Sequence, residues 1–284
     1  MQTMYLKITE ECNLRCPFCY INHKNGVIDI DYALEQIEIY KPQRLVFHGG
    51  EPGLYKETVL DIINAFPNIE TSITTNLMYE IDDTMFEILK RCEIATSYSV
   101  DRFTEDQFHY FRTNIHKVNK IKDITLLVTL SQEQLKQPAK KLVDTIMDLN
   151  PHDVTFERVR IDSIKDDEDY KSLYEQTDLY LYQLFELMPQ SKNNLLHMMQ
   201  NAIYKNTPVF STECDRAVIT ISPDKKISSC PNGSITKQKR KECLTCDFYQ
   251  YCKLDCLSFN IYGCSFPKKT FLKVKGMMKK DGIY

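Results

Sequence analysis

The chain has 284 residues and a formal net charge of −3, and this length suffices for one barrel of about 200 residues plus a smaller appendage. The N-terminus lacks a basic segment followed by an apolar run, and no stretch approaches the roughly 18 apolar residues of a membrane-spanning helix. These features exclude a helical membrane protein and predict a soluble, cytoplasmic one.

Six strand-like runs alternate with helical patterns along the first part of the chain. The strands are predicted at Thr3–Thr9, Arg44–Phe47, Ile69–Thr75, Ile94–Val100, Ile124–Leu130 and Asp153–Val159. The helices between them are predicted at Asp31–Tyr40, Lys56–Ala65, Asp82–Arg91, Thr104–Val118 and Gln132–Asp148. This alternation indicates an α/β fold whose parallel sheet carries helices on its outside.

Beyond the sixth strand the pattern changes to helices and then to a cysteine-rich region. Apolar residues recur at helical spacing from Leu173 to Met188, Pro189 ends that helix, and a second helix is predicted around Asn193–Tyr204. We place the next boundary near Thr207. The predicted parts are therefore a barrel in residues 1–165, a helical bridge in 166–206 and a cysteine-rich domain in 207–284.

Charge and cysteines are both unevenly distributed. The residues before Cys214 carry 22 basic and 33 acidic groups, a net −11, whereas those from Cys214 onward carry 14 and 6, a net +8. This asymmetry suggests an anionic partner for the C-terminal part, with a solvated basic face as the alternative. Of eleven cysteines, three lie within eight residues near the start, seven lie between Cys214 and Cys264, and only Cys92 stands alone. In a reducing cytosol such clusters favour metal binding over disulfides.

Cys12, Cys16 and Cys19 form a C-x3-C-x2-C motif directly after the first predicted strand. Thiolates are the usual protein ligands of iron–sulfur clusters. Three protein ligands on a four-iron cluster leave one iron open to a substrate, much as a catalytic zinc keeps one open position. The missing fourth cysteine therefore agrees with a cluster that takes part in chemistry.

This spacing, with the aromatic Phe18 before the last cysteine, resembles the radical S-adenosylmethionine (SAM) superfamily. The resemblance implies one catalytic [4Fe-4S] cluster, whose open iron chelates the amino and carboxylate groups of SAM. His48, Gly49, Gly50, Glu51 and Pro52 follow the second strand, where the backbone of family members receives the methionine amine of SAM. For the two glycines, an ordinary strand-to-helix turn with positive φ angles is the alternative.

Further strand ends fit the same resemblance. Thr75 and Asn76 close the third strand, where the family often places ribose contacts. Ser99 closes the fourth, where side chains approach SAM, although Ser99 and Asp101 could instead cap the following helix. Arg158 could pair with the SAM carboxylate or form a surface ion pair. The family implies an incomplete (β/α)6, TIM-like barrel with its active site at the C-terminal strand ends, and no catalytic acid or base is evident.

The C-terminal cysteines include a C-x2-C-x5-C-x3-C run, which by itself would suit structural zinc. Joined to the N-terminal motifs, their order resembles the SPASM domain, which carries auxiliary iron–sulfur clusters. The resemblance implies one auxiliary [4Fe-4S] cluster on Cys243, Cys246, Cys252 and Cys264 and another on Cys214, Cys230 and Cys256. Seven thiolates cannot fully ligate two such clusters, so one or two are expected. Lys225 stands where the family often has glycine, so the local Ser222–Ile227 hairpin is expected to differ.

The resemblance implies that SAM is cleaved reductively to methionine and a 5′-deoxyadenosyl radical, which removes a substrate hydrogen while the protein positions the target. The leading interpretation is an oxidoreductase or maturase that modifies a peptide or protein side chain by cross-linking, thioether formation or epimerisation. The alternatives are a radical enzyme acting on a nucleotide or other small anionic metabolite, and a non-enzymatic iron–sulfur electron carrier. Expected partners are a peptide or protein substrate, a separate peptide-recognition protein, and an electron donor such as flavodoxin or ferredoxin. Neither a membrane nor a nucleic acid is favoured as a partner.

Overall fold

The structure is a computed structural model that describes residues 2–19, 21, 23, 26–158, 167–189, 194–205, 218–228, 246–248, 251 and 268–280. The chain forms two compact units. The first comprises residues 1–127, 149–152 and 213–234, and the second comprises residues 128–148, 153–212 and 235–284. Among the described helices, none has the length and apolar character needed to cross a membrane. The three predicted domain ranges stay a prediction.

All six predicted strands form, and a further hairpin extends the sheet. The strands are β1 (Thr3–Thr9), β2 (Arg44–Gly49), β3 (Glu70–Thr75), β4 (Glu93–Tyr98), β5 (Ile124–Leu130), β6 (Asp153–Arg158), β7 (Val218–Ile221) and β8 (Ile227–Ser228). In the first unit the order is β4-β3-β2-β1-β7-β8. Neighbours from β4 to β7 pair in parallel, and only β8 runs antiparallel to its neighbour. The predicted α/β class with a mostly parallel sheet is confirmed.

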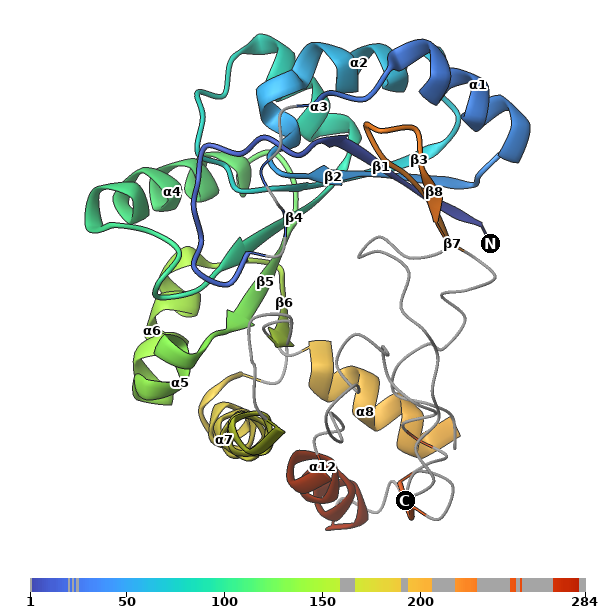
Figure 1. The fold of residues 1–284 in the computed structure, drawn as a ribbon. Coiled ribbons are helices and arrows are strands. Elements are labelled where there is room, and N and C mark those ends of the chain that lie inside the picture. Colours follow the sequence, from blue (N-terminus) through green and yellow to red (C-terminus); the bar gives the residue numbers. More distant parts are fainter. Residues whose placement is uncertain are drawn as a thin grey trace. The chain divides into compact units, whose positions relative to one another are not determined.

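The helices of the first unit begin at side-chain caps that the sequence supplies. They are α1 (Ile30–Tyr40), α2 (Lys56–Ala65), α3 (Asp83–Arg91) and α4 (Glu105–Val118). Asp29 accepts from the Tyr32 N–H and so caps α1, while Thr104 forms a capping box with Gln107 at the start of α4. Figure 1 shows α1, α2 and α3 along one side of the sheet.

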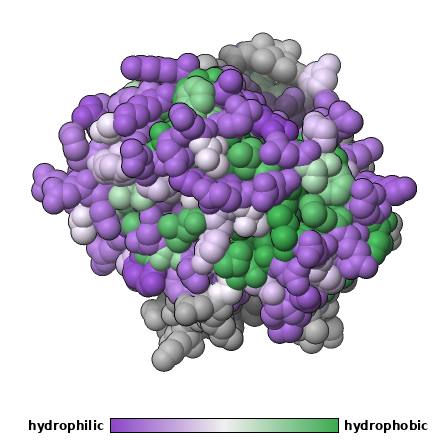
Figure 2. Space-filling view, turned by 90° about the horizontal axis from the view of Figure 1, so that it is seen from above, coloured by the Kyte–Doolittle hydropathy of each residue, from purple (hydrophilic) through white to green (hydrophobic). Residues whose placement is uncertain are grey.

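The two faces of this sheet differ in chemistry. One face carries apolar side chains that are almost fully buried, namely Met4, Leu6, Ile8, Leu45, Phe47, Ile73 and Ile94. Residues that share the other face, by strand register, include Lys7 and His48 of the paired strands β1 and β2. The apolar face holds the helices because burying such side chains is worth roughly 1.5–3 kcal/mol each. Most of the surface seen in Figure 2 is hydrophilic, with one larger group of hydrophobic residues to the right of the centre and smaller ones elsewhere.

The second unit is mainly helical. Its helices are α5 (Gln132–Lys136), α6 (Ala139–Leu149), α7 (Asp167–Leu187), α8 (Asn194–Lys205) and α12 (Lys268–Lys280). The single helix predicted over Gln132–Asp148 is wrong, because the chain leaves the helix at Gln137, with φ −83° and ψ 148°. Pro138 follows, and a residue before proline is pushed out of the helical region. The sequence analysis also missed α12.

Helix α12 is anchored to α7 by a buried carboxylate. Asp178 accepts hydrogen bonds from the backbone N–H groups of Lys269 and Thr270 at 3.0 and 3.2 Å. It also accepts one from the Thr270 hydroxyl at 3.0 Å. A carboxylate at this position satisfies otherwise unpaired N–H groups and suits the positive end of the helix dipole. Helix α12 is therefore held against α7 by specific hydrogen bonds.

The β7–β8 hairpin forms with Lys225 in its turn. Lys225 has φ +61°, in the left-handed region that favours glycine. Its ammonium lies 2.6 Å from Asp29 Oδ2 and 5.3 Å from the centroid of the Tyr32 ring. Hydrogen bonds between Ser222 and the turn residues close the loop. The lysine therefore keeps the backbone shape that glycine would adopt, at a conformational cost.

We predict that Lys225→Gly is more stable than Lys225→Ala by about 1 kcal/mol, because alanine retains the left-handed strain that glycine relieves. Both variants lose the ion pair with Asp29. The difference between their stabilities therefore reports the backbone conformation at residue 225. Thermal unfolding should separate their midpoints by about 2–4 °C. Equal midpoints would show that this turn relaxes to a negative φ in solution.

Candidate active site

The site lies at the C-terminal ends of β1, β2, β3 and β4, which meet at one edge because these strands are parallel. The cysteine loop follows β1, Gly49 ends β2, and Gly50–Pro52 come next. Thr75 ends β3, Asn76 follows it, and Ser99 follows β4. The strand-end residues predicted from the sequence thus share one edge of the first unit.

The two glycines let the backbone of β2 approach the start of the cysteine loop. Gly49 has φ +134°, and a Cβ built on it would lie 2.2 Å from the Thr9 carbonyl oxygen. A Cβ on Gly50 would lie 1.9 Å from the Glu11 carbonyl oxygen. The Gly50 N–H donates to the Thr9 carbonyl and the Glu51 N–H to the Glu11 carbonyl, both at 2.8 Å. Glycine is required here by close backbone packing as well as by a positive φ.

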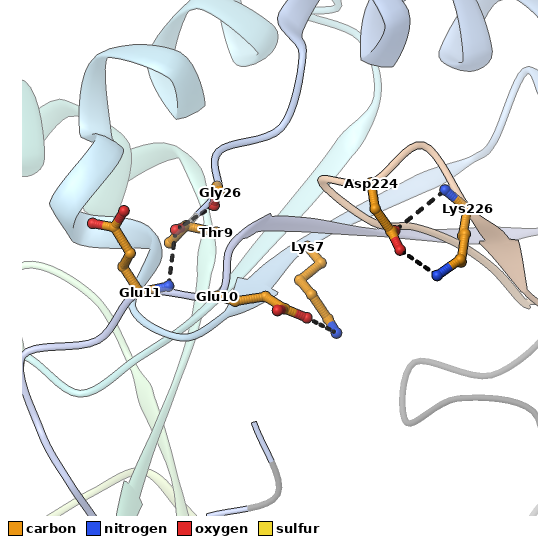
Figure 3. Close-up of polar contacts among 7 residues, drawn as sticks. All are labelled: Lys7, Thr9, Glu10, Glu11, Gly26, Asp224 and Lys226. Carbon is orange, nitrogen blue, oxygen red and sulfur yellow. Dashed lines mark hydrogen bonds and ion pairs between the residues drawn. The ribbon is translucent and has the colours of Figure 1, made fainter. Parts of the chain in front are cut away.

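Thr9 fixes the chain where β1 passes into this loop, and the sequence analysis did not identify it. Its hydroxyl donates to the Gly26 carbonyl at 2.8 Å and accepts from the Glu11 N–H at 3.0 Å (Figure 3). Nearby, the Lys7 ammonium pairs with Glu10 at 3.3 Å. Because Thr9 is fully buried, this side chain sets the direction in which the cysteine loop leaves the sheet.

Glu51 is a fully buried carboxylate that joins β2 to the end of β3. It accepts from the Gly53 N–H at 2.9 Å, the Thr75 hydroxyl at 2.7 Å and the Asn76 N–H at 2.6 Å. Burial raises its pKa, and these hydrogen bonds act in the opposite direction. The buried Tyr79 hydroxyl lies 2.6 Å from Thr75 Oγ1 and extends the network. The Thr75 hydroxyl is therefore hydrogen-bonded within this network, to Glu51 and Tyr79.

Asparagine side chains connect the loop after β3 to the cysteine loop. Asn76 Nδ2 donates to Asn13 Oδ1 at 2.7 Å and to Cys12 Sγ at 3.6 Å. Asn13 Nδ2 in turn donates to the Met78 carbonyl at 2.6 Å. From the other side, Asn114 of α4 donates to the Leu77 and Tyr79 carbonyls at 2.8 and 3.0 Å. No sequence spacing signals these contacts, since each joins segments far apart in the chain.

His48 is a packed, neutral imidazole. Burial and the nearby charge of Lys7 lower its pKa to about 3, and its ring meets the Tyr5 ring edge-on with centroids 5.4 Å apart. Within the described part of the chain, its buried Nε2 has no hydrogen-bond partner. Such an imidazole is not charged at neutral pH.

The structure describes some of the remaining predicted site residues and leaves others outside its described part. Phe18 is half-buried, Pro52 is buried, and Ser99 is fully buried with its hydroxyl on Asp101. The alternative role of Ser99 as a helix cap is not observed, because Thr104 caps α4. The Arg158 side chain lies outside the described part. So do six of the seven C-terminal cysteines, namely Cys214, Cys230, Cys243, Cys252, Cys256 and Cys264; only Cys246, with a free thiol, is described.

Residues 6–136 match the model of the Radical SAM superfamily. The match covers 131 of the 284 residues, a little under half of the chain. An uncharacterized protein of Methanocaldococcus jannaschii is 31% identical over 113 residues, which cover 36% of this chain and 39% of that protein. The GTP 3′,8-cyclase of Clostridium perfringens is 29% identical over 131 residues, 41% of this chain and 40% of the enzyme. The chain thus spans about two fifths of these curated relatives.

A solved structure shows the same fold over a longer stretch. The crystal structure of Streptococcus suis SuiB bound to S-adenosylmethionine aligns with a TM-score of 0.53 and 18% identity, covering 90% of this chain and 71% of SuiB. This likeness agrees with the expected TIM-like partial barrel. The match to the Radical SAM superfamily implies SAM and a catalytic [4Fe-4S] cluster.

The cysteine loop fits such a cluster. Cys12, Cys16 and Cys19 are free thiols in a loop held by a 3.0 Å bond from the Cys19 N–H to the Cys16 carbonyl. Burial raises the pKa of the Cys12 and Cys16 thiols, and the Cys19 thiol raises both further. Within the described ranges, no three His, Cys, Asp or Glu side chains are close enough to hold a single metal ion. A four-iron cluster is wider than one ion, so its thiolates stand farther apart.

Arg102 is a second residue whose importance the sequence did not show. It follows Asp101, and its positive charge opposes the rise in pKa that burial causes at Cys12, Cys16 and Glu51. Its guanidinium lies 5.5 Å from the Phe103 ring centroid, and its buried Nε has no hydrogen-bond partner among the residues that the structure describes. Arg102 therefore brings a cation close to the thiols.

Proposed function

We propose that this protein is a radical SAM enzyme that modifies a side chain of a peptide or protein. The observation that carries the proposal is the cysteine order: a C-x3-C-x2-C motif inside a radical SAM domain, followed by seven C-terminal cysteines in the SPASM order. The net charge of +8 from Cys214 onward suits an acidic peptide. Helix α12 contributes six lysines and no acidic residue.

In this proposal Cys12, Cys16 and Cys19 hold the catalytic cluster. The cluster, when bound, supplies the electron for reductive cleavage of SAM. The backbone at Gly49–Glu51 receives the methionine amine, and its shape is set by the packing against Thr9 and Glu11. Arg102 offsets part of the negative charge of the thiolates. Ser99 and Arg158 are proposed SAM neighbours.

The direct test is anaerobic reconstitution followed by incubation with SAM and a strong reductant. We expect about eight to twelve irons per chain, from two or three four-iron clusters, and formation of methionine and 5′-deoxyadenosine measured by chromatography. A zinc-loaded, iron-free protein that is active would contradict the proposal. So would an iron-loaded protein that leaves SAM intact.

A second candidate is the modification of a nucleotide. The GTP 3′,8-cyclase match favours it, because that enzyme's name specifies a nucleotide substrate. Stimulation of 5′-deoxyadenosine formation separates the two candidates: an acidic peptide library should stimulate it under the peptide proposal, and GTP and other nucleotides under the second. The match covers two fifths of each chain, which we assign to the shared SAM-cleaving part. It therefore does not bear on the substrate, and we retain the peptide proposal.

The proposed auxiliary cluster on Cys243, Cys246, Cys252 and Cys264 makes a separate prediction. Replacing Cys243 and Cys246 with alanine should remove about four irons per chain while SAM cleavage persists without product formation. Iron analysis and parallel assays of 5′-deoxyadenosine and product measure this uncoupling. A soluble double variant that loses iron yet forms product normally would show that the cluster is only structural. Since loss of a metal can unfold a domain, circular dichroism must accompany the assay.

A further inference from the structure

We propose that Asn76 is a positioning residue whose side-chain amide donates a hydrogen bond to the Cys12 sulfur and thereby raises the reduction potential of the catalytic cluster. The inference rests on the proposed function, because it requires Cys12 to be a cluster ligand. The ribose contact predicted for Asn76 would use its side-chain oxygen Oδ1, whereas the donor to Cys12 is the side-chain nitrogen Nδ2.

The Asn76 amide nitrogen has two N–H groups, and both have partners. One points to Asn13 Oδ1 at 2.7 Å and the other to Cys12 Sγ at 3.6 Å, which is within reach for the larger sulfur atom. The Leu14 N–H also donates to Cys12 Sγ, at 3.4 Å. The sulfur therefore receives one backbone donor from its own loop and one side-chain donor from the loop after β3.

The orientation of this amide is fixed by backbone groups. Asn76 Oδ1 accepts from the Met78 N–H at 2.8 Å, so Nδ2 must face the cysteine loop. Its own backbone N–H donates to the buried Glu51 at 2.6 Å. Asn76 is only 2% exposed. Because a carbonyl oxygen accepts two hydrogen bonds, Oδ1 keeps one position for a ribose hydroxyl, but Nδ2 has no N–H left for it.

A donor aimed at a ligand sulfur favours the more electron-rich state of the cluster. The partial positive charge on the N–H stabilises negative charge on sulfur, and hydrogen bonds to the sulfurs are among the factors that set cluster potentials. The effect is stronger in a buried site, where water does not screen the dipole. Removing the N–H should therefore make the cluster harder to reduce.

Asn114 provides a matched control. It is also a buried asparagine, 2% exposed, and its Nδ2 also donates two hydrogen bonds. Both bonds hold the same loop, through the Leu77 and Tyr79 carbonyls, but neither reaches a cysteine. Asn114→Ala therefore removes an equivalent anchor without touching Cys12.

The test is a potentiometric titration of anaerobically reconstituted wild-type, Asn76→Ala, Asn76→Asp and Asn114→Ala proteins, followed by electron paramagnetic resonance. The catalytic signal is the one that disappears when Cys12, Cys16 and Cys19 are replaced. At the wild-type midpoint we expect the ratio of reduced to oxidised cluster to fall about tenfold in Asn76→Ala, which equals about 59 mV for a one-electron couple. Asn76→Asp should fall further, since it adds negative charge, and Asn114→Ala should match wild type.

Each outcome decides the inference. Equal potentials in loaded Asn76→Ala and wild type overturn it, and so does an equal shift in Asn114→Ala, which would assign the effect to the loop as a whole. An Asn76→Ala protein that fails to load the catalytic cluster while Asn114→Ala loads it supports the positioning of Cys12; failure of both overturns it. A wild-type protein that loads the cluster but leaves SAM intact refutes the proposed function alone, because the potentials still decide the role of Asn76.

Discussion

Replacing Cys12, Cys16 and Cys19 together with alanine is expected to reduce 5′-deoxyadenosine formation to the background of an enzyme-free reaction. Without these thiolates no protein ligand remains for the catalytic cluster, and the electron needed to cleave SAM cannot be delivered. Iron content should fall by about four per chain, while iron bound by the C-terminal cysteines remains. Chromatographic assay of 5′-deoxyadenosine with parallel iron analysis measures both effects.

Cys92→Ala is the matched control. Cys92 is fully buried, and its thiol lies 3.5 Å from Thr71 Oγ1. Burial raises the pKa of this thiol to about 11, so it stays protonated at neutral pH and is a poor ligand. This variant should lose a little stability but keep its iron and its SAM cleavage. Retained SAM cleavage in the triple variant, with Cys92→Ala unaffected, would remove the cysteine motif from the mechanism.

The strands and most helices could be predicted because each has a local signal. Alternating or continuous apolar residues marked β1 to β6, and caps such as Asp82 and Thr104 marked helix starts. The pairing of β7 with β1 could not be predicted in the same way. It joins Val218–Ile221 to Thr3–Leu6, and a strand of four residues does not specify a partner strand so far away in the chain.

The site shows the same division between local and long-range information. The sequence motifs located Cys12, Glu51 and Asn76, because each stands at a strand end within a recognisable pattern. What these residues contact depends on tertiary structure. Thr9 and Asn114 carry no motif of their own, yet one directs the cysteine loop and the other holds the loop after β3. Polar residues of these types are common at surfaces, so only the fold distinguishes the buried ones.

The Gly50→Ala substitution is expected to have the second large effect, and it addresses why the motif contains glycine. The added Cβ would stand 1.9 Å from the Glu11 carbonyl oxygen and 2.9 Å from the Glu10 carbonyl carbon. These are backbone atoms, which cannot swing aside as a flexible side chain can. We expect the free energy of unfolding to fall by about 3 kcal/mol or more, at or beyond the upper end of ordinary overpacking. Because the displaced backbone begins the cysteine loop, reconstituted iron should fall as well.

Gly26→Ala separates this clash from any general effect of replacing glycine near Thr9. Gly26 accepts the Thr9 hydroxyl bond through its carbonyl, and among the described residues a Cβ on it would meet only Pro223 Cβ, at an ordinary 3.6 Å. Its unfolding free energy should therefore change by less than about 0.5 kcal/mol. Denaturant unfolding and iron analysis of both variants make the comparison. If Gly50→Ala instead matches Gly26→Ala in stability and iron but binds SAM poorly, the glycine serves the cofactor alone, and the close contact with Glu11 does not hold the cysteine loop.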